Sequence, residues 1–291
     1  MSKKPYDFLS TEKEPFFYIE KGMICMHDGF LCVVNGKEGR VYLSPAGILV
    51  LVLGHGTSIT QEAAIFAAES DMQICFSRGR FNMHSIFMSG RYQDPYPLRN
   101  QISKTEQYRL EYGKLLLRYR FSLLKHLSPQ VEMEIAQLSS VQNILLYEAR
   151  WAKTIYKDFA VRYQVQNFNR TFEFKKSSTA ADLVNERLNV LNNVFYSVCT
   201  SVILATNLSP SIAILHGESR RGGLAFDLAD LFKTSLIFDL AFKQQNITIK
   251  ELMYKLSSRL KENDQWHLKK MIAICLSIGE DNNTLAEVLK I

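Results

Sequence analysis

The strongest constraint on the fold is a long stretch without proline in the second half of the chain. No proline occurs between Pro129 and Pro210, so no residue there is barred from a helix interior. Apolar residues at helical spacing begin just before this stretch, at Tyr108, Tyr112, Leu115, Leu116, Tyr119 and Leu123. Further helices are predicted over about 141–164, 181–205, 249–262, 265–278 and 283–289. The second half of the chain is therefore predicted to be all-helical.

The first part of the chain has a different pattern. Short apolar runs between turn signals predict strands at 16–19, 23–26, 30–34, 40–43, 48–53 and 72–76. A turn with capping residues at 54–60 predicts a helix over about 60–70, with Ile65 and Ala68 facing inward. A polar segment punctuated by prolines, 93–101, is typical of a linker. We therefore predict an α+β protein with a β-rich domain (1–92), a linker (93–101) and a larger all-α domain (102–291).

Charge and cysteine usage restrict the class of protein. The net charge of +6 comes entirely from residues 101–291, with 25 basic and 19 acidic residues against 10 of each before them. A positive helical half suits a polyanionic partner, although a solvated surface explains it as well. Five scattered cysteines without a C-x-x-C pair indicate reduced thiols. With no run of 18 apolar residues and no signal-like N-terminus, we expect a cytoplasmic protein without a membrane span.

The stretch from Leu215 to Lys233 is difficult to explain as ordinary core. Two consecutive glycines break the chain, so a helix is predicted from about Leu224. Asp227 and Asp230 would share one face of that helix, three residues apart, in an otherwise apolar segment. Buried charges need partners or a metal ion. An exposed helix face is the alternative explanation for these two carboxylates.

Two further residues are candidates for the same site. Glu148 lies among apolar neighbours on a helical face, and His216 opens the unusual stretch. A solvated glutamate and a packed histidine are the alternatives for each residue taken alone. Together with the aspartates they form a mixed oxygen and nitrogen ligand set, which suits Mg²⁺ or Mn²⁺, the imidazole favouring Mn²⁺. Such an ion could polarise a phosphoryl oxygen and lower the pKa of a hydroxyl nucleophile.

Motif searches narrow the chemistry further. Arg220 and Arg221 lie between the candidate ligands in sequence and could hold phosphates in a bidentate manner. The sequence contains no G-x-x-x-x-G-K-[ST], no G-x-S-x-G and no H-E-x-x-H. The sequence therefore does not support a P-loop nucleotide hydrolase, a serine hydrolase with the G-x-S-x-G motif or a zincin.

Three blocks of residues resemble the signature of a known family, the CRISPR-associated integrase that acquires spacers, the first and most widespread Cas protein. They are most similar to its type I-F branch, and they occur in the family's order over nearly the whole chain. The blocks are Gly54-x-Gly56-Thr57-Ser58-Ile59-Thr60-Gln61-x-Ala63, Glu148-Ala149-Arg150 with Lys153, and Leu215-His216-Gly217-x-x-Arg220-Arg221-Gly222-Gly223-Leu224-x-Phe226-Asp227-x-Ala229-Asp230-Leu231-x-Lys233.

The resemblance implies a β-rich N-terminal domain, a helical C-terminal domain and a homodimer. It implies that Glu148, His216 and Asp230 are the catalytic metal ligands, with Asp227 as a supporting carboxylate one turn earlier. It also implies that the 3′-hydroxyl of a short double-stranded DNA, the prespacer, attacks a phosphodiester at the end of a CRISPR repeat. This transesterification would need Mn²⁺ or Mg²⁺ and no nucleotide cofactor.

Partners follow from the same resemblance, and two other functions compete with it. Candidate phosphate contacts are Lys153, Lys157, Arg220 and Arg221, for which ordinary solvation is the alternative. A second CRISPR adaptation protein should take part, and in the type I-F branch it is typically fused to the helicase-nuclease. One alternative keeps the metal site but makes the protein a structure-selective nuclease acting on branched DNA in repair. Another is a non-catalytic DNA-binding subunit.

Overall fold

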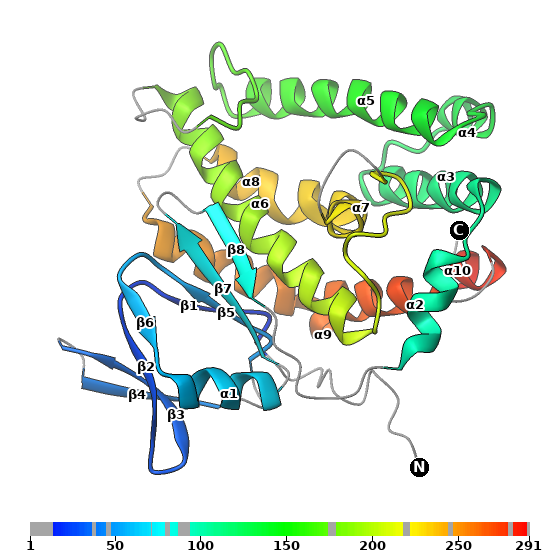
Figure 1. The fold of residues 1–291 in the computed structure, drawn as a ribbon. Helices are drawn as coiled ribbons and strands as arrows, with labels where there is room; N and C mark the ends of the chain where they lie inside the picture. Colours follow the sequence, from blue (N-terminus) through cyan, green and yellow to red (C-terminus); the bar gives the residue numbers. More distant parts are fainter. Residues whose placement is uncertain are drawn as a thin grey trace.

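The computed structural model describes residues 14–36, 39–44, 48–70, 72–78, 82–86, 94–173, 179–217, 222–243, 247–278 and 282–289. The strands lie together at one side of the molecule, and the helices form the remainder (Figure 1). A β-strand region is thus followed by a predominantly helical region, which confirms the predicted fold class.

The first sheet has the strand order β1 (Phe17–Ile19), β5 (Val50–Leu53), β7 (Gln73–Arg78) and β8 (Asn82–Ile86). The first three strands are parallel and β8 is antiparallel to β7. Strand β5 is buried on both faces because its residues alternate between two cores. Val50 and Val52 pack into the core shared with the helices, whereas Leu51 and Leu53 pack into the core between the sheets.

The second sheet has the order β4 (Gly39–Leu43), β3 (Phe30–Asn35), β2 (Gly22–His27) and β6 (Thr57–Ile59). Strand β6 lies within the segment predicted as a turn, and it forms because it pairs in parallel with β2. Strand β8 was not predicted either, and it pairs antiparallel with β7, which was.

Helix α1 (Gln61–Glu69) packs on these strands differently from the prediction. Ile65 is 48% exposed, whereas Ala63 and Ala67 are fully buried. The Thr60 side chain caps the helix by accepting from the Ala63 N–H, which fixes its first turn. The small Ala63 and Ala67 side chains, one turn apart, then face the core. The prediction that Ile65 faces inward is therefore wrong.

The helical region contains the elements expected from periodicity and several shorter ones. They are α2 (Pro95–Ile102), α3 (Glu106–Leu123), α4 (Pro129–Ala136), α5 (Val141–Arg162), α6 (Ala180–Ala205), α7 (Gly223–Lys233), a π-helical turn (Thr234–Phe238), α8 (Asp239–Phe242), α9 (Ile249–Ile278) and α10 (Asn282–Leu289). The π-helical turn joins α7 to α8 without a loop.

Helix α6 is the central helix of the molecule. It contacts β5 and β8 of the first sheet and α7 and α9 on the helical side (Figure 1). Among the described helices it alone is long and apolar enough to cross a membrane, but 72% of that window is buried inside the protein. Its apolar surface is therefore explained by its place in the core.

Two helical predictions need correction. The segment 93–101, predicted as a linker, contains most of α2. Both of its prolines lie in the first turn of that helix, where backbone N–H groups have no helical partner, and Asp94 caps it by accepting from the Tyr96 N–H. The helices predicted at 249–262 and 265–278 are one helix, α9. Asn263 has a φ of 51°, a conformation that asparagine tolerates, so the interruption is one residue within the helix.

Candidate metal centre

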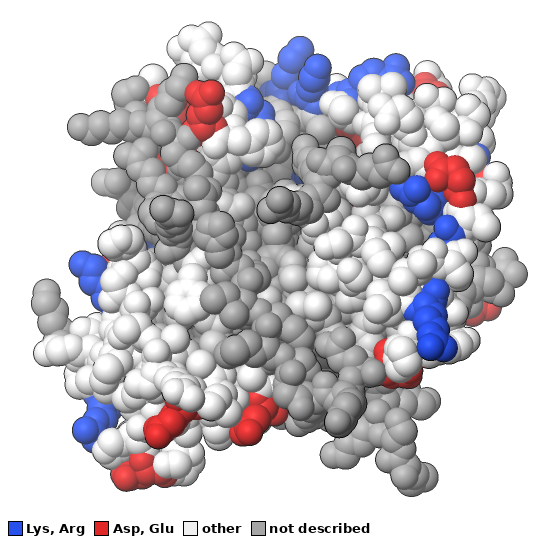
Figure 2. Space-filling model, viewed as in Figure 1, with Lys and Arg blue, Asp and Glu red and all other residues white. Residues whose placement is uncertain are grey.

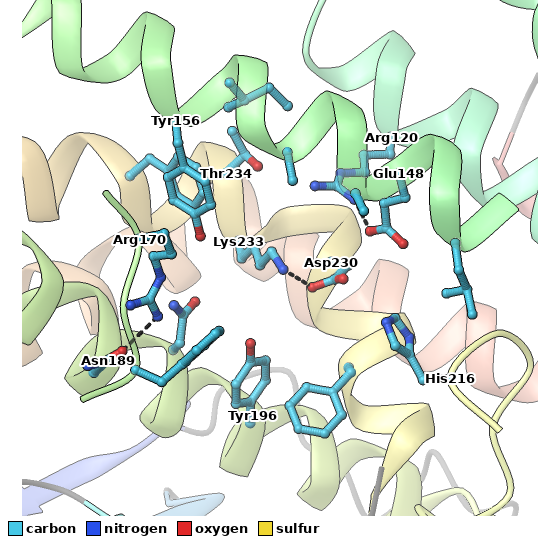
Figure 3. Close-up of a pocket in the computed structure, with 18 of the residues that line it drawn as sticks. Arg120, Glu148, Tyr156, Arg170, Asn189, Tyr196, His216, Asp230, Lys233 and Thr234 are labelled. Carbon is cyan, nitrogen blue, oxygen red and sulfur yellow. Dashed lines mark hydrogen bonds and ion pairs between the residues drawn. The ribbon is translucent and has the colours of Figure 1, made fainter. Parts of the chain in front are cut away.

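Three predicted residues from separate parts of the sequence meet in one place. Glu148 comes from α5, His216 from the segment before α7, and Asp230 from α7 (Figure 3). Each offers one ligand atom, and these atoms all lie within 4.8 Å of one another. The three side chains line a pocket of about 640 Å³ between α5, α6 and α7.

Glu148 is buried because of where α5 places it. The helix begins after Ser140, whose side chain accepts from the Asn143 N–H. Ile144 and Ile155 are both buried, and Glu148 shares their face at positions i+4 and i−7. Its exposed fraction is only 9%. The alternative of a solvated glutamate is therefore wrong.

Arg120 is a residue of the site that the sequence reasoning missed. It lies on the buried face of α3, four residues after Leu116, and forms an ion pair with Glu148. Removing two charges from water is costly unless they compensate each other. The signal was present in the sequence, because a guanidinium group on an apolar stripe is as unusual as a carboxylate on one.

Asp227 organises the backbone around His216. Its carboxylate accepts from the backbone N–H groups of Ile214 (2.7 Å), Leu215 (3.0 Å) and His216 (3.2 Å). The same carboxylate lies 2.6 Å from Nδ1 of His216. Since a carboxylate only accepts, Nδ1 carries the proton and Nε2 is left as the ligand atom.

Opposing influences set the pKa of His216. Burial alone would lower this pKa, but the hydrogen bond and negative charge of Asp227, with the charges of Asp230 and Glu148, raise it above the usual value. His216 is partly buried, and the packed-histidine alternative omits the carboxylates around it.

Asp230 and Lys233 form a second ion pair within the site, three residues apart on α7 (Figure 3). Burial opposes ionisation of Asp230, but Lys233 and Arg120 hold its pKa well below the usual range. Burial would lower the pKa of Lys233, and Asp230 raises it above its usual value. Lys233 is part of the sequence motif, but no role was predicted for it. Its spacing of three residues from Asp230 on a helix is typical of an ion pair.

The donor set fits a hard divalent cation. Burial raises the pKa of Glu148, and the nearby charge of Asp230 raises it further, whereas Arg120 and Lys233 oppose this. Arg120 contacts Oε1 of Glu148 and Lys233 contacts Oδ1 of Asp230, so the second oxygen of each carboxylate is not used by these pairs. Two carboxylates and one imidazole nitrogen suit Mg²⁺ or Mn²⁺. Glu148, His216 and Asp230 could hold such an ion together.

The opposite wall of the pocket is also polar and was not predicted. Helix α6 contributes the side chains Asn189, Asn192, Asn193 and Tyr196, and Arg170 and Phe172 lie beside them. Arg170 donates to Oδ1 of Asn189 at 2.7 Å (Figure 3). Three asparagines on an apolar helix were the available signal, since buried amides need hydrogen-bond partners.

Of the four candidate phosphate contacts, the structure describes the two lysines but not the two arginines. Lys153 and Lys157 are exposed on α5 beside the pocket, but they are not among the residues that line it. Arg150 and Arg162 are exposed on the same helix. Figure 2 shows lysine and arginine side chains along the edge of the molecule where α5 runs in Figure 1. Arg220 and Arg221 lie outside the described residues.

Most of the helical region matches a known protein family. Residues 98–258, which include all three candidate ligands, match the family model described as CRISPR associated protein Cas1. Over 239 residues the chain is 30% identical to the CRISPR-associated endonuclease Cas1 2 of Chlorobaculum tepidum, covering 79% of this chain and 75% of that relative.

Solved structures share the fold. TtCas1 in complex with DNA has a TM-score of 0.75 at 20% identity over 91% of both chains. A casposase bound to an integration product has a TM-score of 0.72 at 15% identity, over 91% of this chain and 90% of that one. A chain of a Cas6-RT-Cas1–Cas2 complex has a TM-score of 0.70 at 11% identity, over 92% of this chain and 35% of that one. On the family match and the sequence identity together, the chain belongs to the Cas1 family, whose named relatives are CRISPR-associated endonucleases.

Proposed function

We propose that this protein is a metal-dependent DNA endonuclease and integrase, which inserts short DNA fragments as new spacers into a CRISPR array. The observation that carries the proposal is the meeting of Glu148, His216 and Asp230 within 4.8 Å. The fold shared with TtCas1 in complex with DNA and with a casposase bound to an integration product supports it.

The reaction would be attack of a DNA 3′-hydroxyl on a phosphodiester of the repeat. Mn²⁺ or Mg²⁺ bound by the three ligands would polarise a phosphoryl oxygen and lower the pKa of the hydroxyl. Asp227 holds the proton of His216 on Nδ1 and so presents Nε2 to the site. Exchange of one phosphodiester for another needs no nucleotide cofactor.

Arg120 and Lys233 have a further part in this proposal. They are the cationic partners of Glu148 and Asp230, and both line the pocket in which a phosphate group would lie. They hold the pKa of Asp230 low, oppose the rise in the pKa of Glu148, and would attract the negative charge that grows on the phosphoryl oxygens. Because the site is largely shielded from water, these interactions act at reduced dielectric.

A homodimer is part of the proposal, and one face of the second sheet supports it. Phe30 is 61% exposed, and Met23 and Tyr42 are exposed on neighbouring strands. The Phe30 and Tyr42 rings touch edge to face, with centroids 6.3 Å apart. An apolar group of this kind is typical of a protein–protein contact. Phe30→Glu should convert a dimer into a monomer by light scattering, and an unchanged dimer would refute this contact face.

The proposed DNA partners are the prespacer duplex and the CRISPR repeat, and the proposed protein partner is a second CRISPR adaptation protein. The fold shared with a chain of the Cas6-RT-Cas1–Cas2 complex supports that partner. The sequence blocks support the type I-F branch, in which the partner is fused to the helicase-nuclease. A neighbouring CRISPR array with such a fused gene would establish the branch, and an unfused partner gene would refute it.

The decisive experiment combines a 3′-hydroxyl duplex, Mn²⁺ and a supercoiled plasmid that carries the repeat. We expect joined products, and Glu148→Ala, His216→Ala or Asp230→Ala should lower their yield by at least about 10²-fold. Glu132→Ala, at an exposed position on α4, is the control that should retain activity.

The outcomes separate the competing functions. Cutting without joining would favour the structure-selective nuclease on branched DNA. Binding of DNA without either reaction would favour a non-catalytic subunit. Full integration by any of the three ligand variants would overturn the proposed site.

A further inference from the structure

Gln101 is one of the least exposed polar side chains in the helical region. It lies near the end of α2 with an exposed fraction of 2%. Its Nε2 donates to the carbonyl oxygens of Ser209 (2.9 Å) and Ile212 (2.7 Å). Its Oε1 accepts from the N–H of Ser209 at 2.8 Å. Both amide protons and the oxygen are thus committed to one distant piece of backbone, more than 100 residues away in sequence.

That piece of backbone is residues 209–217, which we call the histidine segment because it carries His216. It is irregular rather than helical or extended. Irregular backbone next to a core must find partners for its N–H and C=O groups outside a regular ladder. Side chains supply many of these partners here, and each comes from a different helix.

Three side chains hold the histidine segment along its length. Gln101 of α2 binds its beginning, and Arg109 of α3 donates from Nε to the Ile214 carbonyl at 2.9 Å. Asp227 of α7 binds the N–H groups of residues 214–216 and the imidazole of His216. The bond from Gln101 to Ile212 therefore ends only two residues before the first bond from Asp227.

We propose that Gln101 is a positioning residue for His216. Its amide fixes the backbone at residues 209 and 212. The position of residues 214–216 relative to the Asp227 carboxylate follows from this. The orientation of the imidazole then follows from Asp227. Without the amide, the Ser209 N–H and the Ile212 C=O lose this partner, the Ser209 C=O keeps only the Ile212 N–H, and the segment relaxes toward other arrangements. This inference rests on the proposed metal site, in which His216 is a ligand.

Gln73 offers a matched control. It is the same residue type with the same exposed fraction of 2%, and it accepts from the Ser201 hydroxyl on α6. It lies on β7 of the first sheet and is not among the residues that line the pocket. Replacing it by methionine makes the same chemical change at equal burial, away from the histidine segment.

The test measures Mn²⁺ affinity by calorimetry and thermal unfolding without metal, using the full chain. Gln101→Met should weaken Mn²⁺ binding about tenfold, as changes behind a metal ligand commonly do. Gln73→Met should leave Mn²⁺ affinity within about twofold of the parent protein, since Gln73 makes no contact with the histidine segment. If Gln101→Met does not fold, the milder Gln101→Asn keeps the amide and withdraws it by one methylene.

A double-mutant cycle separates this inference from the metal site itself. His216→Ala alone should weaken Mn²⁺ binding, and adding Gln101→Met should weaken it no further, because the ligand that Gln101 positions is gone. Unchanged affinity in Gln101→Met or Gln101→Asn, or additive losses in the cycle, would overturn the positioning role. Unchanged affinity in His216→Ala would instead overturn the proposed metal site.

A second readout needs no metal. At a pH well above the pKa of His216, where the ring is neutral, its ¹⁵N shifts report which nitrogen carries the proton. The parent protein and Gln73→Met should show one tautomer with the proton on Nδ1, whereas Gln101→Met should show a mixture. A single Nδ1–H tautomer in Gln101→Met would contradict the proposal.

Discussion

At the scale of single residues, Asp227 links the backbone of the site to its chemistry. Its buried carboxylate accepts hydrogen bonds from three backbone N–H groups and from the Nδ1–H of His216. The geometry of the ring and the geometry of the backbone therefore depend on the same two oxygens. A change that preserves the shape of Asp227 but removes its charge should reveal this dependence.

Asp227→Asn should lower the pKa of His216 in the metal-free protein, since the hydrogen bond and charge of Asp227 raise it. In the parent protein the folded-state pKa lies above the ordinary 6.5. Protonated His216 therefore stabilises the fold fully below pH 6.5, and this contribution is lost as the pH rises through the folded-state pKa. NMR titration of the ring and Tm measured against pH test this. Identical titrations in the two proteins would contradict it.

Arg120→Met should leave Glu148 buried without its partner. Breaking a buried pair from one side costs about 3 kcal/mol in the free energy of unfolding. The pKa of Glu148, already raised by burial and by Asp230, should rise further because Arg120 lowers it. The pH at which Mn²⁺ binding is half complete should rise accordingly. Urea unfolding and Mn²⁺ titrations at several pH values measure both effects, with the exposed Arg150→Met as control.

Glu148 shows how far sequence reasoning reaches at this scale. The spacing within its helix was compatible with a solvated residue and with a ligand. What decides between them is Arg120, which comes from another helix and cannot be seen in the periodicity of α5. The resemblance to the family pointed to the three candidate ligands. It did not reveal Arg120 or the role of Gln101, whose partners lie more than 100 residues away.

At the scale of elements, helices with a sustained apolar face were predictable, as were the short α1 and α10, whereas β6, α2 and α4 were not. Helices α5 and α6 lie within two residues of their predicted ends, because each carries a sustained apolar face. Strand β6 has three residues and exists because β2 lies beside it. The prolines of α2 were compatible with a linker and with a first helical turn. The segment is helical in the structure, and its Gln101 donates to the distant Ser209 and Ile212 carbonyls, contacts that the sequence does not reveal.

Helix α1 gives a direct test of burial at this scale. Ile65→Lys should change the free energy of unfolding by no more than about 0.5 kcal/mol, since the side chain is largely outside the core. Ala67→Lys should cost several times more, because it places a charge and extra volume at a fully buried position. Denaturant unfolding of the two variants compares them, and equal losses would mean that α1 presents another face to the sheet.

At the scale of the whole molecule, basic side chains lie both inside the pocket, at Arg120, Arg170 and Lys233, and on the exposed surface of α5. Four basic residues are exposed on α5, the helix that carries Glu148, namely Arg150, Lys153, Lys157 and Arg162. The pairs formed by Arg120 and Lys233 lie deeper, against the carboxylates. An outer basic edge suits the sequence-independent phosphate contacts that hold a duplex in register.

Lys153→Ala and Lys157→Ala should weaken duplex binding and reduce the slope of log affinity against log salt by about 1 each. Lys21→Ala, at an exposed position beside β2, should leave the slope unchanged. Fluorescence anisotropy over a series of salt concentrations measures the slopes. A slope unaffected by both α5 variants would remove that helix from the DNA path.

The π-helical turn between α7 and α8 has a consequence for insertions and deletions. A π-turn corresponds to one extra residue within an α-helix. Before the turn, Asp230 faces the pocket, and at the end of the turn Phe238 stacks on Tyr156 with centroids 4.8 Å apart. Loss of one residue from Thr234–Phe238 would rotate one end against the other by about 100°. Natural relatives should therefore vary in sequence between Asp230 and Phe242 but keep its length, as an alignment without gaps would show.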